Sequence, residues 1–298
     1  MRFRFHTSTW LLLCLAAAPA LAQRAGSLDA IPGLLKTPDA NAVWAEQMAG
    51  HPAPDHFGTR HLAGVEAETL RQLLVPDVAA DRIVLLGARR WVQHPGHVVA
   101  LVCYRADVSR NAPAEPSCET SDTAQLLGVL RVDDAGKPQR VARLQLDRDV
   151  AWPLLAWAGG HPLRLEEAGA AAIPERWERF DLAAYRLSDG PPALGLRGGW
   201  SEGYSGGGAF YSALYLFELR GDALRQVLAT EISMYRDIAG RWNDDGTREH
   251  DIEEWAGVLI VEPRAHHGYQ DLRLRERGGR GGTLYRWSPA ADRYQRVE

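Results

Sequence analysis

From residue 81 onward the chain is a series of short apolar runs separated by turn sequences rich in Gly, Asp and Pro. Runs of this length favour β-strands, because helices in globular proteins average about 11–12 residues. No helix-like segment alternates with them, so a parallel β-α-β fold is not expected. We therefore predict a mainly β fold with antiparallel strands. The first strands are expected at Arg82–Trp91, His97–Arg105, Leu126–Val132 and Val141–Leu146.

A second set of strands is expected toward the C-terminus. Three hairpins share a pattern. Each has an apolar strand, a turn with Gly, Asp or Ala, and a second strand in which Gln or Arg precedes Val. The pattern recurs at unequal spacing, so it indicates a meander, either incomplete propeller-like or a sandwich, and not a fixed-period repeat. The expected strands are Ala193–Arg197, Phe210–Leu219, Leu224–Glu231, Ala256–Pro263, Asp271–Arg277 and Thr283–Trp287.

The N-terminal part differs from the rest of the chain. Residues 1–22 have a positive start, an apolar run and Ala20-Leu21-Ala22 as a cleavage site, which is typical of a secretory signal peptide. The apolar run is too short to span a membrane, which requires about 20 residues. We expect a periplasmic or secreted protein without a transmembrane segment. In an oxidising compartment, Cys103 and Cys118 are expected to form a disulfide.

The predicted organisation after the signal peptide has four regions. Residues 23–80 form a lead-in with short N-terminal helices, from Thr37 to about Met48 and over Glu66–Leu74. A front β region (81–150), an irregular connector with three prolines (151–179) and a back β region (180–298) follow. The alternative is that residues 81–298 form one domain.

The charge balance excludes one large class of partner. The chain has 34 Lys and Arg residues against 38 Asp and Glu, a net charge of −4. A net acidic protein is a poor general ligand for nucleic acid, so we expect no nucleic-acid partner.

One loop stands out as a candidate binding site. Aromatic residues surround a run of Ser and Gly, a composition typical of recognition surfaces. The glycines are expected to supply a positive φ or a close backbone approach. The candidate residues are Trp200, Tyr204, Ser205, Gly206, Gly207, Gly208, Phe210 and Tyr211.

The same loop admits a catalytic interpretation. Gly203-Tyr204-Ser205-Gly206-Gly207 matches the G-x-S-x-G pattern, so a secreted serine hydrolase using Ser205 is an alternative. That motif works at a strand-turn-helix junction, whereas the residues after Gly208 read as a strand. We therefore favour a non-catalytic protein and assign no catalytic residue.

Two further polar segments could bind ligands. Oxygen-bearing side chains at Asn243, Asp245, Thr247 and Asp251 are a possible Ca²⁺ ladder, and polar Asn/Asp/Gly turns also occur without metal. No other cofactor is expected. The arginines of 273–280 are either the solvated face of a strand or a patch facing carboxylates or glycans.

The back half also carries a family resemblance. It rests on the Gly203–Ala209 loop, the Leu214–Arg220 strand, the Asp245–Asp251 segment and the closing hairpin with Tyr285-Arg286-Trp287 and Arg293-Tyr294. These features resemble uncharacterised secreted proteobacterial β-rich proteins, with a C-terminal half similar to FG-GAP-like and periplasmic lysozyme-inhibitor-like proteins. The resemblance implies a protein partner, a cell-wall hydrolase or toxin. The sequence thus predicts a periplasmic binding protein, an inhibitor or immunity protein against a cell-wall-degrading enzyme; a calcium-dependent glycan-binding envelope module is another alternative.

Overall fold

A computed structural model describes residues 26–35, 41, 44, 54–105, 118–121, 123–152, 155, 157, 162 and 173–297. The chain has two compact units, Met1–Pro54 and Asp55–Glu298. In the first unit, Leu28–Ala30 forms a 3₁₀ turn, η1. The signal peptide (1–22) and most of the helix expected from Thr37 to about Met48 lie outside the described residues.

The second unit begins with short helices and a four-stranded sheet. The 3₁₀ turns η2 (Leu62–Gly64) and η3 (Ala80–Arg82) flank the α-helix α2 (Ala67–Leu74), which was expected at Glu66–Leu74. The sheet is an antiparallel meander in the order β1-β2-β3-β4. Its strands are β1 (Ile83–Arg90), β2 (His97–Tyr104), β3 (Ala124–Val132) and β4 (Pro138–Gln145).

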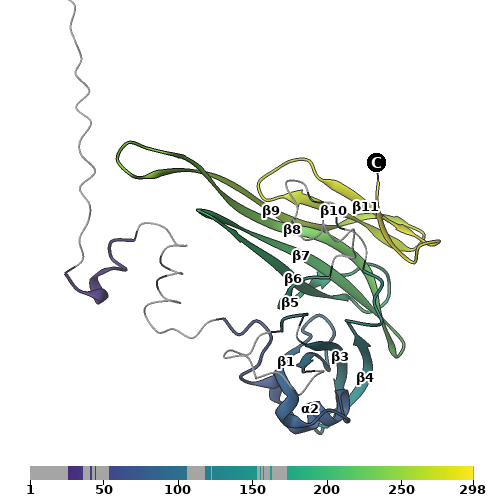
Figure 1. Cartoon of the computed structure of the whole chain (residues 1–298). Helices are drawn as coiled ribbons and strands as arrows, with labels where there is room; N and C mark the ends of the chain where they lie inside the picture. The colour runs from purple at the N-terminus through teal and green to yellow at the C-terminus, as the bar shows by residue number, and fades with distance from the viewer. Residues whose placement is uncertain are drawn as a thin grey trace, which may run out of the picture. The chain divides into compact units, whose positions relative to one another are not determined.

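The remaining strands form an eight-stranded antiparallel meander in the order β5 to β12 (Figure 1). Two of its strands, β8 and β9, have 20 and 19 residues. The bounds are β5 (Arg176–Tyr185), β6 (Ala193–Tyr204), β7 (Gly207–Arg220), β8 (Ala223–Trp242), β9 (Arg248–His266), β10 (Tyr269–Glu276), β11 (Thr283–Ser288) and β12 (Arg293–Arg296).

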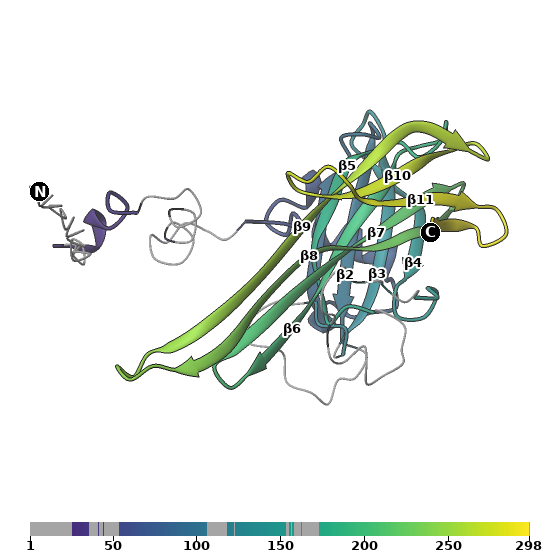
Figure 2. The ribbon, with the colours of Figure 1, turned by 90° about the horizontal axis from the view of Figure 1, so that it is seen from above.

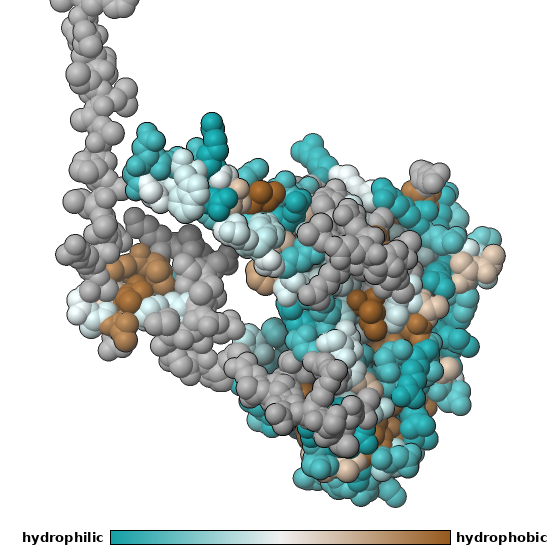
Figure 3. All heavy atoms as spheres, in the orientation of Figure 1, coloured by the Kyte–Doolittle hydropathy of each residue, from teal (hydrophilic) through white to brown (hydrophobic). Residues whose placement is uncertain are grey.

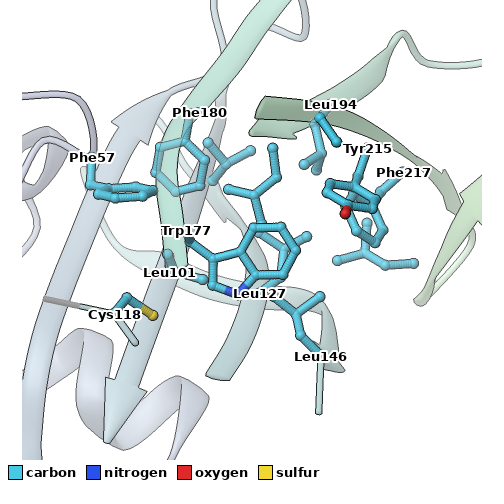
Figure 4. Packing of buried hydrophobic residues seen from close by; sticks show 14 of the residues in the cluster. Phe57, Leu101, Cys118, Leu127, Leu146, Trp177, Phe180, Leu194, Tyr215 and Phe217 are labelled. Carbon is cyan, nitrogen blue, oxygen red and sulfur yellow. The ribbon is translucent and has the colours of Figure 1, made fainter. Parts of the chain in front are cut away.

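The two sheets pack face to face around the largest apolar core. Alternate residues of β2 and β3, such as Leu101 and Leu127, point toward Trp177, Tyr215 and Phe217 of the larger sheet (Figure 4). The Trp177 ring meets the Tyr215 ring edge-on, with 5.4 Å between the centroids. Aromatic side chains bury large apolar areas, so this layer is the main source of stability between the sheets.

Each sheet also has a second buried face. On the far side of the four-stranded sheet, Leu70 and Leu74 of α2 pack on β2 and β3, where Gly128 has no side chain and leaves room for Leu74. On the far side of the larger sheet, β7 and β8 pack against β10, β11 and β12 around Leu216, Leu272 and Trp287. The larger sheet therefore curls over its own C-terminal strands.

The predicted disulfide is present. Cys103 at the end of β2 bonds to Cys118, both side chains are buried, and their Cα atoms are 5.6 Å apart. The backbone N–H of Trp177 donates to the Cys118 carbonyl at 3.2 Å. The disulfide thus lies in the core between the two sheets.

The predicted fold class is confirmed: the described chain is mainly antiparallel β with few short helices, and its sheets make a sandwich. Several expectations about strand bounds were wrong. β6 continues to Tyr204, beyond the expected end at Arg197, and β9 begins at Arg248, before the expected start at Ala256. β5 occupies Arg176–Tyr185, so a strand starts inside the segment interpreted as a connector. β8 continues to Trp242, eleven residues beyond the expected end at Glu231.

Candidate functional site

A row of large side chains closes one end of the core in the larger sheet. Trp200 of β6, Tyr211 of β7, Met234 of β8 and Trp255 of β9 occupy paired positions across four strands. Trp157 meets the rings of Trp200 and Tyr211 edge-on, at centroid distances of 5.5 and 5.6 Å. Beyond this row the same strands continue, and Ala209 is the one residue of these strand ends that is still buried in the core.

We call this continuation the arm, defined as residues 201–210 of the β6–β7 hairpin and residues 235–254 of the β8–β9 hairpin. Figure 2 shows the ends of β6, β8 and β9 extending past the four-stranded sheet. Four large hydrophobic side chains of the arm are exposed: Tyr204 by 41%, Phe210 by 55%, Trp242 by 69% and Ile252 by 56%. The surface around them is mainly hydrophilic, with isolated apolar side chains (Figure 3).

Polar contacts hold the two hairpin ends together. The Tyr204 hydroxyl donates to the Asp237 carbonyl oxygen at 2.8 Å. Arg248 donates from Nε to the Gly240 carbonyl at 3.0 Å and lies over the Trp242 ring, 5.3 Å from its centroid. The arm is therefore an extension of the sheet whose two hairpins are joined by hydrogen bonds.

A cleft of about 540 Å³ lies at the base of the arm. Its wall includes Phe210 and Tyr235, whose rings are 6.4 Å apart on neighbouring strands. Glu254 is paired with Tyr235 and lines the same cleft. The lining is mainly polar or charged, with arginine and glutamate side chains beside the aromatic ones, so the cleft suits a polar or charged group of a ligand.

Hydrogen bonds order the polar side of the cleft. The Ser212 hydroxyl donates to Glu178 Oε2 at 2.8 Å, and Arg176 donates to the Ser201 hydroxyl at 3.1 Å. Gly199 makes the first contact possible, because a Cβ there would collide with the Glu178 carboxylate. The floor of the cleft thus depends on one glycine of β6.

Two arginines of the cleft lie directly opposite each other. Arg179 of β5 pairs with Arg197 of β6. Arg197 binds Asp181, with 2.7 Å between Nη2 and Oδ2, whereas no described residue gives the Arg179 guanidinium a hydrogen bond or ion pair. Burial, and then the charge of Arg197, lower the pKa of Arg179. Like charges in opposed positions destabilise a sheet, so this part of the cleft can accept an anionic group such as a carboxylate.

The structure divides the predicted binding loop into three parts. Trp200 and Tyr211 are buried in the core, 2% and 3% exposed. Ser205 and Gly206 form the exposed turn between β6 and β7. Gly206 has a φ of +84°, and Gly207 lies against the Asp237 carbonyl with no room for a Cβ, so both expected uses of glycine occur.

The other predicted loop residues lie on the arm. Gly208 pairs with Asp237, Tyr204 links the hairpins, and Phe210 lines the cleft. The side chain most available for contact is Phe210, since that of Tyr204 is engaged in holding the hairpins.

The geometry at Ser205 bears on the hydrolase alternative. The residue is in a strand-turn-strand, with β7 where the nucleophile motif has a helix. On the neighbouring strands His250 Nδ1 lies 2.6 Å from Asp237 Oδ1, but no hydrogen bond of the described residues joins this imidazole to the Ser205 hydroxyl. Catalysis by Ser205 stays a prediction that fluorophosphonate labelling of wild type and Ser205→Ala would test.

The predicted calcium ligands fall at the turn between β8 and β9. Asp245 accepts hydrogen bonds from the Thr247 N–H at 2.9 Å and hydroxyl at 2.6 Å, and the Asn243 amide donates to the same hydroxyl at 3.0 Å. Asp251 lies further along β9, opposite Ile238. Among the described residues no group of three or more His, Cys, Asp or Glu side chains is placed to hold a metal. Calcium binding stays a prediction, to be tested by melting with Ca²⁺ and EDTA.

Several residues of the surface were not anticipated from the sequence. Arg176, Glu178 and Arg179 lie in the first part of β5, which was interpreted as the end of the connector. Tyr235 and Ile252 lie in the parts of β8 and β9 beyond the expected strands. The sequence signal that could have predicted β5 is the presence of two aromatic residues, Trp177 and Phe180, among charged residues.

Within the described part of the chain, no helix is long and apolar enough to cross a membrane. Comparison of the chain with protein-family models, with curated proteins and with solved structures finds no match.

Proposed function

We propose that this chain is a secreted, non-catalytic binding protein that docks a protein partner on the arm and the adjoining cleft. The observation that carries this proposal is the exposure of Tyr204, Phe210, Trp242 and Ile252 within one arm. Elsewhere in the described chain, the large hydrophobic side chains with comparable exposure are Leu28, Val92 and Val258. Phe210 and Ile252 lie on the same face of the arm, because their partners on β8, Tyr235 and Asp237, are two residues apart. Exposed aromatic residues supply much of the binding energy at protein interfaces.

The partner class that we propose is a cell-wall-degrading enzyme, which the protein would inhibit. A narrow arm of paired strands suits insertion into the substrate groove of such an enzyme, and its exposed rings would replace apolar contacts of the substrate. The disulfide is consistent with an oxidising compartment, where wall-degrading enzymes act.

Affinity capture with matched variants tests the proposal. The purified chain is immobilised and exposed to periplasmic and secreted proteins, together with a Phe210→Ala/Trp242→Ala variant and a Val92→Ala control. Val92 is 75% exposed and lies outside the arm. Wild type and control should retain the same wall hydrolase, and the double variant should bind it at least about tenfold more weakly.

Inhibition is then measured on the captured enzyme. Its activity on peptidoglycan should fall in proportion to added wild-type protein and should be little affected by the double variant. Equal capture by the double variant would refute the arm as the binding surface. Capture without inhibition would refute the inhibitor function while leaving a binding protein.

A further inference from the structure

The outer edge of β9 is open along the arm. β10 pairs with β9 from His266 to Gly257 and ends there, opposite Glu276. From Ala256 to Arg248, β9 continues with β8 on one side, and no described strand lies on its other side.

The register shows which backbone groups face outward. The Ala256 carbonyl points away from β8, since it accepts a hydrogen bond of 2.8 Å from the Arg277 N–H. Backbone direction alternates along a strand, and β8 pairs regularly with β9 over this segment, so Glu254, Ile252 and His250 also face outward. Their N–H and C=O groups form a ladder edge that another strand can extend.

The side chains along this edge are acidic with one apolar anchor. Glu249, Asp251, Glu253 and Glu254 lie within six residues. From β8, Arg236 pairs with Glu253 at 2.9 Å and Arg241 with Glu249 at 3.9 Å, which leaves the edge net acidic through Asp251 and Glu254. Ile252 in the middle is 56% exposed. Charges alone would protect an edge from unwanted pairing. An exposed β-branched residue in the same segment favours a specific partner strand.

We propose that β9 binds a basic extended segment of the protein partner by strand addition, with the partner strand taking the place that β10 would occupy if it continued past Glu276. This inference rests on the proposed function and specifies the chemistry of the partner. Backbone hydrogen bonds supply affinity in strand addition, and alternate side chains supply specificity. Lys or Arg on the added strand would pair with the acids of β9, while an apolar residue would contact Ile252.

The test uses a synthetic probe and two variants at one position. The probe is the capped peptide Arg-Val-Lys-Val-Arg-Val-Lys, and the control peptide has proline in place of each valine. Ile252→Pro removes an N–H that points outward without breaking the ladder to β8. Ile252→Val keeps the N–H and a branched side chain. Affinity is measured by fluorescence anisotropy, and folding by circular dichroism and Tm.

The expected result has three parts. The valine peptide binds wild type and Ile252→Val with equal affinity, Ile252→Pro binds it at least about tenfold more weakly, and the proline peptide binds none of them. Equal binding to Ile252→Pro, binding of the proline peptide to wild type, or no binding at about 1 mM peptide would overturn strand addition.

A second pair of variants covers the case in which Ile252→Pro does not fold. Asp251→Lys/Glu254→Lys reverses two charges on the edge, and Asp189→Lys/Asp222→Lys makes the same change of net charge at exposed turns away from the arm. The first should abolish peptide binding and the second should preserve it. Equal effects of the two would overturn the proposal.

Two further outcomes separate this inference from the function itself. If the captured hydrolase is lost by Phe210→Ala/Trp242→Ala but kept by Ile252→Pro, the binding function holds and strand addition is wrong. If wild type self-associates in sedimentation and Ile252→Pro is monomeric, the edge pairs with a second copy of the chain, which overturns the basic-partner proposal.

Discussion

Phe210 and Tyr211 are consecutive residues of β7 on opposite faces of the larger sheet, and their side chains are 55% and 3% exposed. Successive strand residues alternate between faces, so one step along the chain separates a core aromatic from a surface aromatic. Substitution of Tyr211 should therefore change the stability of the fold, whereas substitution of Phe210 should change only the surface.

The first prediction compares alanine substitutions at these neighbours. Tyr211→Ala removes a ring packed against Trp157 and should lower the free energy of unfolding by about 3–5 kcal/mol. Phe210→Ala should change it by about 0.5 kcal/mol or less, since surface substitutions rarely cost more. Urea denaturation measures both values. A large loss with Phe210→Ala would show that the arm belongs to the folding core.

The second prediction concerns two glycines of the same strand. A Cβ at Gly199 would collide with the Glu178 carboxylate, whereas a Cβ at Gly203 meets nothing within 4 Å. Gly199→Ala should displace Glu178 from Ser212 and destabilise the protein by about 1–3 kcal/mol. Gly203→Ala should be close to neutral and is the matched control. Denaturation curves of the two variants check the difference, and similar stabilities would contradict the packing of Glu178 against Gly199.

The third prediction concerns the disulfide. Its two cysteines are 15 residues apart, a separation for which closing the loop stabilises the folded state by about 3 kcal/mol in the chain-entropy model. Cys103→Ala/Cys118→Ala should therefore lower the free energy of unfolding by roughly this amount. Reductant should destabilise wild type to a similar extent and leave the variant unchanged. A wild type insensitive to reductant under unfolding conditions would count against the bond.

The fourth prediction is the pH dependence of stability in alkali. Burial, and then the nearby charge of Glu218, raise the pKa of the Tyr294 hydroxyl, which also donates to the Gln270 carbonyl at 2.7 Å. Because the folded-state pKa is the higher one, the stabilisation is complete below the unfolded pKa of about 10 and is lost as the pH rises above it.

The measurement is urea denaturation of wild type and Tyr294→Phe between pH 8 and 11. Above about pH 10, the stability of wild type should fall more steeply than that of the variant, by up to about 1.4 kcal/mol per pH unit. Parallel profiles would show that Tyr294 ionises equally in the folded and unfolded chain.

The strands that the sequence located well are those with a buried face. β2 and β3 read as apolar runs because both of their faces are covered, by α2 on one side and the larger sheet on the other. β10 and β11 retain the alternation of a half-buried strand, as with Leu272 and Leu274. Burial leaves a hydrophobic period in the sequence, and the period reveals the strand.

The arm lacked such a signal. Past Met234 both faces of β8 are partly exposed, so Tyr235, Asp237 and Ile238 follow no two-residue hydrophobic period. β5 was missed for a related reason, because Trp177 and Phe180 are three residues apart across a register shift. The binding loop was singled out by composition, but composition does not distinguish a buried Trp200 from an exposed Phe210.

The arm is a direct prolongation of β6 to β9, and it starts where the row from Trp200 to Trp255 ends. Exchanges at Phe210, Trp242 or Ile252 therefore do not disturb the packing that folds the chain. Substitutions in the arm can therefore change which partner the protein binds while its free energy of unfolding stays nearly constant. Divergence among descendants should accordingly concentrate at the hairpin ends, and grafting these ends onto another sandwich should transfer partner choice.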